Sequence, residues 1–395
     1  MRFVEEMIDE TRIKKNLEEI SFPRRFGTDL EKRAFNQIES KVNNMDLKTN
    51  RQFFSFTTFY SAISIKIYIL MIFLAFILKQ LHVSDFFFIP ISFVIIIISV
   101  LLYIYTRHPE KIRLGKVLNS ENLLVKLSSE GKNNKKDENT KNIIFLAHVD
   151  SKGQTIPSGF RSWCVLVWVV SIPTLIVLYF FREYTFPSIS LIFHWIATPL
   201  FMIHLIAGTI ILFNFSNNKS LGALDNASGV VVILELLHYY SDKINRPRNY
   251  DLWFLFLGAE EVGRLGMRVF LNELGKISIE KYLFLNFETI GRMADLVRFN
   301  DLNTHSKSFA KLIMRNSAKY DTKIKEKRAI IGYHTDSRIC AKSGLQVLEF
   351  GDGFSYKYNH SKKDTIDMID LNLLKKLCNI VVASVKELDQ KSVNN

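Results

Sequence analysis

Four long apolar blocks interrupt an otherwise mixed pattern of apolar and polar positions. They cover residues 60–77, 86–105, 162–181 and 189–215. Each block is close to the ~20 residues that a helix needs to cross the hydrocarbon core of a bilayer, and the second contains no charged residue. Short polar pieces, Lys79–Asp85 and Arg182–Pro187, join the blocks in pairs. We therefore expect two transmembrane helical hairpins, with a buried pair of soluble helices as the alternative for the first.

Outside these blocks, short apolar runs alternate with amphipathic stretches. Runs rich in β-branched and aromatic residues predict strands, whereas apolar positions three or four apart predict helices. The predicted strands lie at residues 51–56, 118–127, 142–147, 282–287, 296–299 and 345–350, and in the run that opens at Leu252. The predicted helices lie at residues 29–42, 264–274, 306–319 and 370–388, with another beginning near Asn226 and a helical turn after His334. Thr28 is the expected N-cap of the first helix. This alternation indicates a layered α/β fold.

The two hairpins divide the α/β sequence into three pieces. The predicted segments are an N-terminal part at residues 1–59, hairpin 1 at 60–105, a continuation at 106–161, hairpin 2 at 162–215 and the main catalytic part at 216–395. Two spans return the chain to the side of the bilayer that it left, so the separated pieces can pair in one sheet. The polar stretch 128–142 is expected to be a hairpin turn or loop.

The formal net charge of +13 raises the question of nucleic-acid binding. The Lys and Arg residues are scattered or lie beside the apolar blocks, without a recognisable nucleic-acid motif, so we expect contact with a lipid bilayer instead. Cations cluster within residues 24–48 and 107–116, on either side of the first hairpin, whereas the connecting turns carry little charge. By the positive-inside rule, this pattern predicts an integral membrane protein whose catalytic part and both termini face the cytoplasm.

Two further features concern the compartment. The three cysteines, Cys164, Cys340 and Cys378, form neither a CxxC pair nor a disulfide framework, which fits a reducing compartment. The first 20 residues are charged and lack an apolar segment, so we expect no cleavable signal peptide. His194 and His204 lie within the last apolar block, where both a functional role and interhelical packing are open.

The run that opens at Leu252 ends in two adjacent carboxylates, Glu260 and Glu261. In open α/β sheets, ligands bind at the carboxyl ends of the strands. At such a place, one of two neighbouring glutamates can ligate a cation while the other transfers a proton. The alternative is that both are acidic residues in the first turn of the next helix, where the helix dipole favours them.

Further acidic residues and histidines follow other predicted strands. They are His148 with Asp150, Asp225, Glu288 and His360. Each has an ordinary explanation by itself: a surface imidazole, a helix cap or an exposed loop carboxylate. Their joint occurrence at strand ends predicts a metal site instead, because carboxylates and imidazoles suit zinc. The spacing places Asp150 to orient His148, and Asp364 is a candidate for a comparable supporting part near His360.

Several of these residues stand in motifs that resemble a known family. The motifs HVD, LDNASG, GAEEVGRLG, NFETIG and NHSKKDT resemble the dizinc aminopeptidase family, which includes bacterial leucyl aminopeptidases, glutamate carboxypeptidase II and glutaminyl cyclases. The pieces PRRFGTDLEKRA and HTDSRICAKSGLQVLEF resemble its membrane-bound branch, which includes the endoplasmic reticulum metallopeptidases. The resemblance covers the chain from about residue 20 onward apart from the hairpins. It implies a mixed, largely parallel sheet sandwiched between helices.

The resemblance also implies a role for each residue. Asp225 would bridge two zinc ions, His148 and Glu288 would complete one site, Glu261 and His360 would complete the other, and Glu260 would be the general base. The implied protein is a membrane-anchored, zinc-dependent exopeptidase, an aminopeptidase in the first place, which hydrolyses peptides or protein termini. Two metals that share a carboxylate can activate a water molecule for attack on a peptide bond.

The chain departs from the soluble relatives at two places. Many of them have Asp where this chain has Glu288, and a hairpin replaces their short loop between His148 and Asp225. That hairpin suggests a site near the membrane surface, reached by flexible peptides or membrane-proximal chains. The alternatives are a glutaminyl-cyclase-like enzyme with one zinc ion, a non-catalytic scaffold and a transporter. The complete ligand set argues against the first two, and the near absence of charge in the spans argues against the last.

Overall fold

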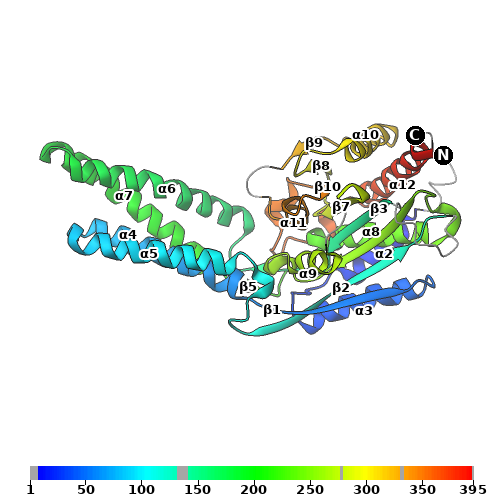
Figure 1. The fold of residues 1–395 in the computed structure, drawn as a ribbon, viewed down its shortest axis with the longest axis horizontal. Helices are drawn as coiled ribbons and strands as arrows, with labels where there is room; N and C mark the ends of the chain where they lie inside the picture. The colour runs from blue at the N-terminus through cyan, green and yellow to red at the C-terminus, as the bar shows by residue number, and fades with distance from the viewer. Residues whose placement is uncertain (1–7, 131–140, 276–278, 330–332, 394–395) are drawn as a thin grey trace. The chain divides into compact units, whose positions relative to one another are not determined.

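The computed structural model describes residues 8–130, 141–275, 279–329 and 333–393 (Figure 1). Its contacts divide the chain into two compact units. The first, here called the α/β unit, comprises Met1–Ser55, Leu118–Gly153 and Asn217–Asn395, and the second, the helical unit, comprises Phe56–Val117 and Gln154–Ser216. Most of the loop predicted at 128–142 lies outside the described residues.

An eight-stranded sheet forms the centre of the α/β unit, in the order β1-β2-β6-β3-β7-β10-β8-β9. The strands are β1 (Thr49–Thr57), β2 (Val117–Leu127), β3 (Lys141–His148), β6 (Tyr250–Leu257), β7 (Tyr282–Glu288), β8 (Asp295–Arg298), β9 (Glu326–Arg328) and β10 (Gln346–Gly351). The short strands β4 (Gly153–Gln154) and β5 (Ser216–Asn217) pair separately. Strands β6, β3, β7 and β10 run parallel, whereas β2 is antiparallel to β6, and β8 is antiparallel to β10 but parallel to β9. The predicted mixed, largely parallel sheet is confirmed.

The register of the parallel strands aligns their carboxyl ends. His148 at the end of β3 lies opposite Leu257 at the end of β6. Glu288 at the end of β7 lies opposite Gly351 at the end of β10. Side chains that follow these strands therefore meet along one edge of the sheet, which is where α/β proteins bind their ligands.

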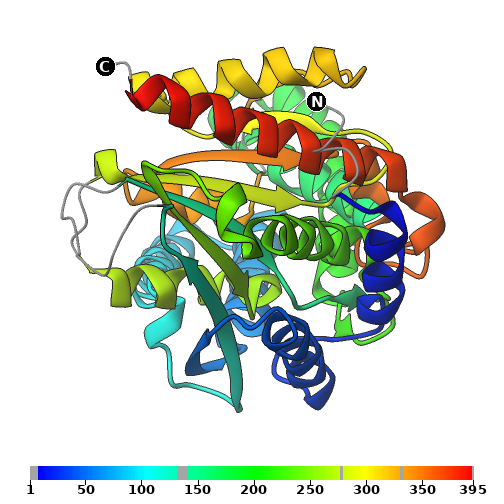
Figure 2. The ribbon, with the colours of Figure 1, turned by 90° about the vertical axis from the view of Figure 1, so that its right-hand side faces the viewer.

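Helices cover both faces of this sheet. Residues of α2 (Glu10–Ile20), α3 (Asp29–Asn43), α8 (Ser228–Ser241), α10 (Thr304–Lys319) and α12 (Leu371–Val393) share one apolar core with the sheet. Residues of α9 (Leu265–Leu274) and α11 (Asp336–Lys342) share the other. Figure 2 shows α10 and α12 running side by side. The α/β unit is thus a sheet between two helical layers.

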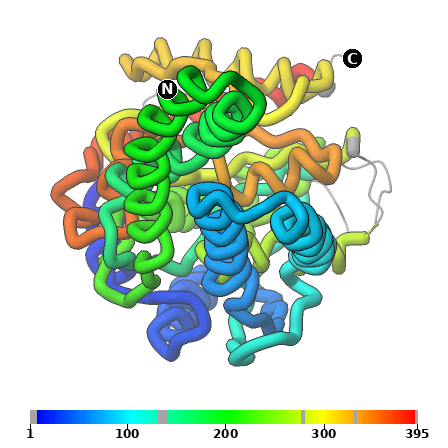
Figure 3. The backbone as a smooth tube through the Cα atoms, turned by 90° about the vertical axis from the view of Figure 1, so that its left-hand side faces the viewer, coloured from blue at the N-terminus to red at the C-terminus, as the bar shows by residue number. Residues whose placement is uncertain are grey.

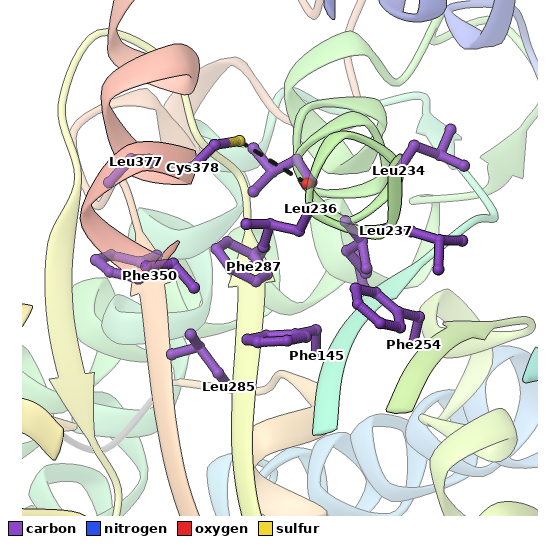
Figure 4. Close-up of a cluster of buried hydrophobic side chains, with 14 of the residues drawn as sticks. Phe145, Leu234, Leu236, Leu237, Phe254, Leu285, Phe287, Phe350, Leu377 and Cys378 are labelled. Carbon is purple, nitrogen blue, oxygen red and sulfur yellow. Dashed lines mark hydrogen bonds between the residues drawn. The ribbon is translucent and has the colours of Figure 1, made fainter. Parts of the chain in front are cut away.

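The two cores follow from the alternation of side chains along the strands. Phe145 and Phe254 belong to the first core, whereas their neighbours Ile144 and Trp253 belong to the second. Figure 4 shows the first core, in which aromatic rings from the strands meet leucines of α8 and the start of α12. Burying one such aromatic side chain stabilises the fold by about 1.5–3 kcal/mol.

Two local features differ from the sequence-based expectations. The helix expected near Asn226 begins at Ser228, because Asp225 and Asn226 have non-helical backbone angles. The Asn226 side chain instead accepts the backbone N–H of Thr289 at 3.1 Å and donates to the Phe287 carbonyl at 2.8 Å. Strand β9 was not predicted, since its sequence EKR is entirely exposed and offers no apolar alternation.

The helical unit contains α4 (Ile65–Gln80), α5 (Asp85–Thr106), α6 (Ser158–Tyr184) and α7 (Pro187–Leu212), which Figure 3 shows together. These elements lie at the four predicted apolar blocks. With the turn that precedes α4, the helices at Phe59–Gln80, Asp85–Thr106, Ser158–Tyr184 and Pro187–Leu212 are long and apolar enough to cross a membrane.

Polar contacts join the two hairpins inside the helical unit. Gln80 of α4 donates to the Thr198 hydroxyl of α7 at 3.0 Å and accepts from the Tyr179 hydroxyl of α6 at 2.9 Å. His204 is fully buried, forms a 2.7 Å hydrogen bond with Ser171, and packs edge-on against aromatic rings of α4. Of the two roles left open for His204, these contacts favour packing.

Candidate metal centre

The structure brings the proposed ligands and the proposed base together at the carboxyl edge of the sheet. His148 ends β3, Glu260 and Glu261 form a turn after β6, Glu288 ends β7, Asp225 precedes α8 and His360 follows β10. These side chains come from positions spread over more than half of the chain. Their convergence results from the strand register and from the kinked turn before α8.

Asp225 lies between the two imidazole rings. Its Oδ1 is 3.1 Å from Nε2 of His148, and its Oδ2 is 3.2 Å from Nε2 of His360. Asp225 is itself only 5% exposed, so both contacts are shielded from solvent. One carboxylate therefore faces two histidines with its two oxygens, which is the arrangement that a bridging ligand requires.

Two groups of donor atoms share this carboxylate. His148, Asp225 and Glu288 form one group and Asp225, Glu261 and His360 form the other, each with its donor atoms within 4.8 Å of one another. Nε2 of His148 is 3.3 Å from Oε1 of Glu288, and Nε2 of His360 is 2.7 Å from Oε1 of Glu261. Among the described residues these are the groups of three or more donors close enough to hold a metal ion.

Asp150 contributes to the site through both its backbone and its side chain. Nδ1 of His148 lies 3.0 Å from the Asp150 carbonyl oxygen, so an Nδ1–H can donate to it and leave the Nε2 lone pair toward Asp225. The Asp150 carboxylate accepts the backbone N–H groups of Glu260 at 3.0 Å and Glu261 at 3.1 Å. The sequence suggested that Asp150 orients His148, and the nearer contact is made by its carbonyl, because Oδ1 is 3.6 Å from Nδ1.

A second buried carboxylate, which the sequence did not indicate, supports the turn that carries Glu260. Ala259 has a φ of 54°, the left-handed region. Oε1 of Glu31 accepts the Ala259 N–H at 3.2 Å and the Ser120 hydroxyl at 2.7 Å. At the start of α3, the Glu31 N–H donates to the Thr28 hydroxyl at 3.4 Å, and Oε2 of Glu31 accepts the Gly27 N–H at 2.6 Å. These local capping contacts do not indicate the contact with Ala259, which depends on the tertiary fold.

Charge in this cluster is unbalanced, which shifts the pKa of several groups. Burial raises the pKa of Glu260 well above its usual value, against the opposing effect of His148. Burial also raises the pKa of Glu288 to about 7. Burial tends to raise the pKa of Glu261, but His360 and Lys152 lower it to about 2.

The pKa values of the two histidines are raised, and that of the shared aspartate, Asp225, is lowered. Burial lowers the pKa of His148, but the Glu288 carboxylate and neighbouring acceptors raise it well above its usual value. The pKa of His360 is raised in the same way, with Glu261 opposing the effect of burial. Hydrogen bonds from both rings hold the pKa of Asp225 below its usual range despite burial. Without a cation, burial favours the protonated forms of Glu260 and Glu288, and the neighbouring carboxylates favour the protonated forms of both imidazoles.

This donor set fits zinc. Imidazole nitrogens and carboxylate oxygens are its usual ligands after thiolates. The raised pKa of Glu288 reflects buried negative charge that a divalent cation would neutralise. The residues present therefore fit zinc, the metal that the family resemblance implies.

Three further contacts support the ligands. Lys152 Nζ lies 3.0 Å from Oε2 of Glu261. Asn286 donates to Oε2 of Glu349 at 3.0 Å and lies 3.5 Å from Oε2 of Glu288. Lys152, two residues after Asp150, could have been noted from the sequence. Asn286 and Glu349 stand within the quoted pieces NFETIG and HTDSRICAKSGLQVLEF, but their contact depends on the pairing of β7 with β10, which the sequence does not show.

Asp364 has a different neighbour from the expected one. Its Oδ1 accepts the Leu224 N–H at 2.6 Å, and its Oδ2 accepts the Ser220 hydroxyl at 3.0 Å. Asp364 therefore holds the loop that leads to Asp225, whereas the sequence suggested a supporting part near His360. Burial raises the pKa of Asp364 to about 7, and the nearby Asp225 carboxylate acts in the same direction.

Comparisons with known proteins agree with this arrangement. The sequence model of peptidase family M28 matches residues 188–385. A comparison with curated protein sequences finds no match.

Several solved structures share the fold. An aminopeptidase from Aneurinibacillus sp. strain AM-1 superposes with a TM-score of 0.58 and 14% identity, over 96% of this chain and 94% of that one. A zinc aminopeptidase from Bacillus subtilis gives a TM-score of 0.55 and 13% identity, over 96% and 95%. The glutaminyl cyclase of Fimbriiglobus ruber gives a TM-score of 0.54 and 13% identity, over 96% of this chain and 95% of that one. At these identities the likeness establishes the fold.

Proposed function

This chain belongs to peptidase family M28, and from that premise we propose that it is a membrane-anchored, zinc-dependent exopeptidase that acts as an aminopeptidase. The observation that supports this proposal most directly is the position of Asp225. Its two oxygens lie 3.1 and 3.2 Å from the Nε2 atoms of His148 and His360, so one carboxylate can serve two metal sites. A co-catalytic pair of ions requires such a shared ligand.

The proposed sites use the two donor groups described above. His148, Asp225 and Glu288 would hold one zinc ion, and Asp225, Glu261 and His360 would hold the other. Bound zinc supplies a water molecule of lowered pKa and stabilises the negative charge that develops on the peptide oxygen. The Asp150 carbonyl keeps the His148 Nε2 lone pair directed into the site.

Glu260 is proposed as the general base. It follows β6 at the carboxyl edge of the sheet, next to the proposed ligand Glu261, and its N–H bond to Asp150 fixes its backbone. Its carboxylate takes a proton from the attacking water and delivers it to the leaving amine nitrogen. The raised pKa of Glu260, caused by burial and nearby carboxylates, favours this exchange because a base must also be able to hold the proton until the amine accepts it.

Membrane anchoring is the second part of the proposal. Four helices that are long and apolar enough to span a bilayer support it. The cations that flank the first hairpin support a cytoplasmic position of the α/β unit. The proposed substrates are the free ends of flexible peptides or proteins.

A direct test uses the full-length protein, purified in detergent. It is expected to contain about two zinc ions per chain and to release N-terminal residues from short peptides. Glu260→Gln is expected to retain the zinc and to lose turnover by about 10²–10⁴-fold. Glu273→Gln is the matched control, because Glu273 is an exposed residue of the following helix, α9.

The substrate panel separates the other activities. It contains peptides with free or blocked amino ends, peptides with free or amidated carboxyl ends, and peptides that begin with Gln. Release of ammonia from the last group without cleavage would show a cyclase, and cleavage only at free carboxyl ends would show a carboxypeptidase. Either result, or a wild-type protein that binds no zinc, would overturn the proposed activity.

A further inference from the structure

Arg24 is a fully buried arginine in the segment that connects α2 to α3. Its guanidinium donates hydrogen bonds to five backbone carbonyl oxygens. They belong to Val149 at 2.5 Å, Leu221 at 2.7 Å, Gly222 at 2.8 Å, and Ile20 and Phe22 at 3.1 Å each. The motif PRRFGTDL around Arg24 is part of the sequence resemblance, but the proposed chemistry assigns it no role.

Three of these carbonyls belong to the loops that carry the proposed ligands. Val149 stands between His148 and Asp150 in the chain. Leu221 and Gly222 stand just before the kinked turn of Asp225. A single side chain thus connects the loop after β3 with the loop before α8.

The backbone of Arg24 reinforces the first of these connections. Its N–H donates to the Ser151 hydroxyl at 3.1 Å, and its carbonyl accepts the Ser151 N–H at 3.1 Å. Together with the guanidinium bond to Val149, these contacts hold the chain on both sides of Asp150. The loop that bears His148 is therefore attached to the N-terminal segment by three hydrogen bonds.

Only arginine satisfies this set of acceptors. Its planar guanidinium presents five N–H donors in a fixed geometry, whereas lysine presents three donors from one atom. The carbonyls of Ile20 and Gly222 also accept the backbone N–H groups of Phe22 at 2.8 Å and Ala227 at 2.9 Å. Losing the Arg24 donors from the carbonyls of Val149 and Leu221 is costly in a site closed to water. The Arg24 guanidinium also packs closely against Gly222. This residue has a φ of +63°, and a Cβ added to it would lie 2.9 Å from an Arg24 nitrogen.

The charge of Arg24 has a second effect. Burial lowers the pKa of Arg24 to about 10, so the guanidinium remains positive at neutral pH. The carboxylates of Asp364, Asp150, Asp225 and Glu261 lie near enough to raise that pKa. Arg24 therefore brings a fixed positive charge to a cluster that has an excess of negative charge.

We propose that Arg24 is a positioning residue of the metal centre, which sets the separation of His148 and Asp225 by holding Val149 and Gly222. The inference rests on the proposed zinc-dependent function and extends it. Because the His148 ring and the Asp225 carboxylate must meet one ion, a shift of either loop weakens the ion's binding. Residues that orient ligands typically change metal affinity by about 10–100-fold when they are replaced.

The test compares Arg24→Met and Arg24→Lys with the wild-type protein, as full-length chains in detergent. Zinc is removed with a chelator, and the dissociation constant for zinc is measured by competition with a chromophoric chelator. Arg24→Met is expected to bind zinc about 10–100-fold more weakly. Arg24→Lys keeps the charge but lacks the planar set of N–H donors. Its zinc dissociation constant is expected to lie between those of Arg24→Met and the wild type. With saturating zinc, kcat should fall further than KM rises.

Two matched controls separate positioning from folding. Arg25→Met changes the neighbouring arginine, whose guanidinium lies over the Phe26 ring. Arg12→Met removes a structural arginine that pairs with the buried Glu235 at 2.5 Å. Arg12→Met is expected to lower the melting temperature of the zinc-free protein, and both controls are expected to leave the zinc dissociation constant unchanged.

The possible outcomes are distinct. If the wild type binds zinc and both Arg24 variants bind it equally well, Arg24 is a folding residue only and the inference is wrong, while the proposed function stands. If Arg24→Met does not fold, the decision rests on Arg24→Lys: weaker zinc binding by the folded protein supports the inference, and unchanged binding overturns it. A wild-type protein without zinc affinity overturns both the inference and the proposed function.

Discussion

Asp150 holds the backbone of Glu260: its Oδ1 accepts the Glu260 N–H at 3.0 Å. Its other carboxylate oxygen accepts the Glu261 N–H at 3.1 Å, and its carbonyl lies 3.0 Å from Nδ1 of His148. One residue thus fixes the proposed base, one ligand of the second site and one ligand of the first. The positions of Glu260 and Glu261 depend on the Asp150 carboxylate, and that of His148 depends on the Asp150 carbonyl.

We expect Asp150→Asn to impair catalysis more than stability. An asparagine side chain retains one acceptor oxygen but turns an NH₂ group toward the second backbone N–H, so one of the two bonds is lost. The turn that carries Glu260 is then less well placed. Activity is expected to fall by about 10–100-fold, as for other residues that orient ligands, and is measured as kcat with saturating zinc.

Asp251→Asn provides the control for that substitution. Asp251 lies near the opposite end of β6 and accepts a backbone N–H, that of Ser129, at 2.9 Å. It therefore tests the same chemical change away from the site. Equal losses of kcat in the two variants would show that the Asp150 contacts only stabilise the fold.

Zinc affinity is expected to depend on pH. Carboxylates raise the pKa of His148 and His360 against the effect of burial, and burial raises that of Glu288 to about 7, so these ligands hold protons in the zinc-free protein. Zinc requires the deprotonated ligands, so binding releases these protons. Lowering the pH therefore weakens binding, and affinity rises with pH until the ligands have lost their protons.

The measurement is the zinc dissociation constant between about pH 6 and about pH 8, the range in which histidines titrate. Each proton displaced makes the constant about tenfold weaker per unit of decreasing pH. Calorimetry in buffers of different ionisation enthalpy gives the number of protons independently. A dissociation constant that does not change over this range would contradict the proposed ligand protonation.

The sheet could be predicted because its strands are regular. The buried parallel strands β3, β6 and β7 are nearly continuous apolar runs, such as LWFLFL in β6, and the ends of those runs mark the edge of the sheet. Strand β9 could not be predicted, since all three of its residues are exposed and its assignment depends on pairing with β8. Helix α8 begins at Ser228, two residues after the expected position near Asn226, because the geometry of Asp225 and Asn226 depends on contacts with residues far along the chain.

The candidate ligands and the support Asp150 were recognisable from their residue types and spacing, whereas Arg24 and Glu31 stand in the quoted piece PRRFGTDLEKRA without a role that the sequence could assign. His148 and Glu288 follow apolar runs and have the chemistry of ligands. Arg24 acts through backbone carbonyls up to 198 positions away, and a carbonyl carries no information about side-chain identity. Glu31 likewise reaches the Ala259 N–H across 228 positions. Such contacts depend on the tertiary fold and leave no local pattern.

We expect Glu288→Asp to weaken the first zinc site selectively. Nε2 of His148 is 3.3 Å from Oε1 of Glu288, and Asn286 lies 3.5 Å from the other oxygen. The aspartate arm is one methylene shorter, so its carboxylate withdraws from His148 unless the strand shifts. One of the two ions should bind about tenfold more weakly, whereas the other keeps its affinity.

A zinc titration of the chelated protein measures this difference as two separate dissociation constants. Glu280→Asp, an exposed glutamate beside the start of β7, is the control and should leave both constants unchanged. If Glu288→Asp binds two ions as tightly as wild type, Glu288 is not a ligand or the longer arm has no consequence for the site.

The proposed topology places the α/β unit on the cytoplasmic side of the membrane and the turn between α4 and α5 on the opposite side, which an impermeant reagent reaches in intact cells if that membrane bounds the cell. The native cysteines Cys164, Cys340 and Cys378 are buried, so the wild-type chain provides a low labelling background. In intact cells, Ser84→Cys is expected to react with a membrane-impermeant maleimide, because Ser84 lies in the exposed turn after α4. Lys307→Cys, on the exposed side of α10, should react only after the cells are permeabilised. Labelling of Lys307→Cys in intact cells, with Ser84→Cys protected, would reverse the proposed orientation. The cations near the first hairpin would then lie on the outer side, contrary to the positive-inside rule.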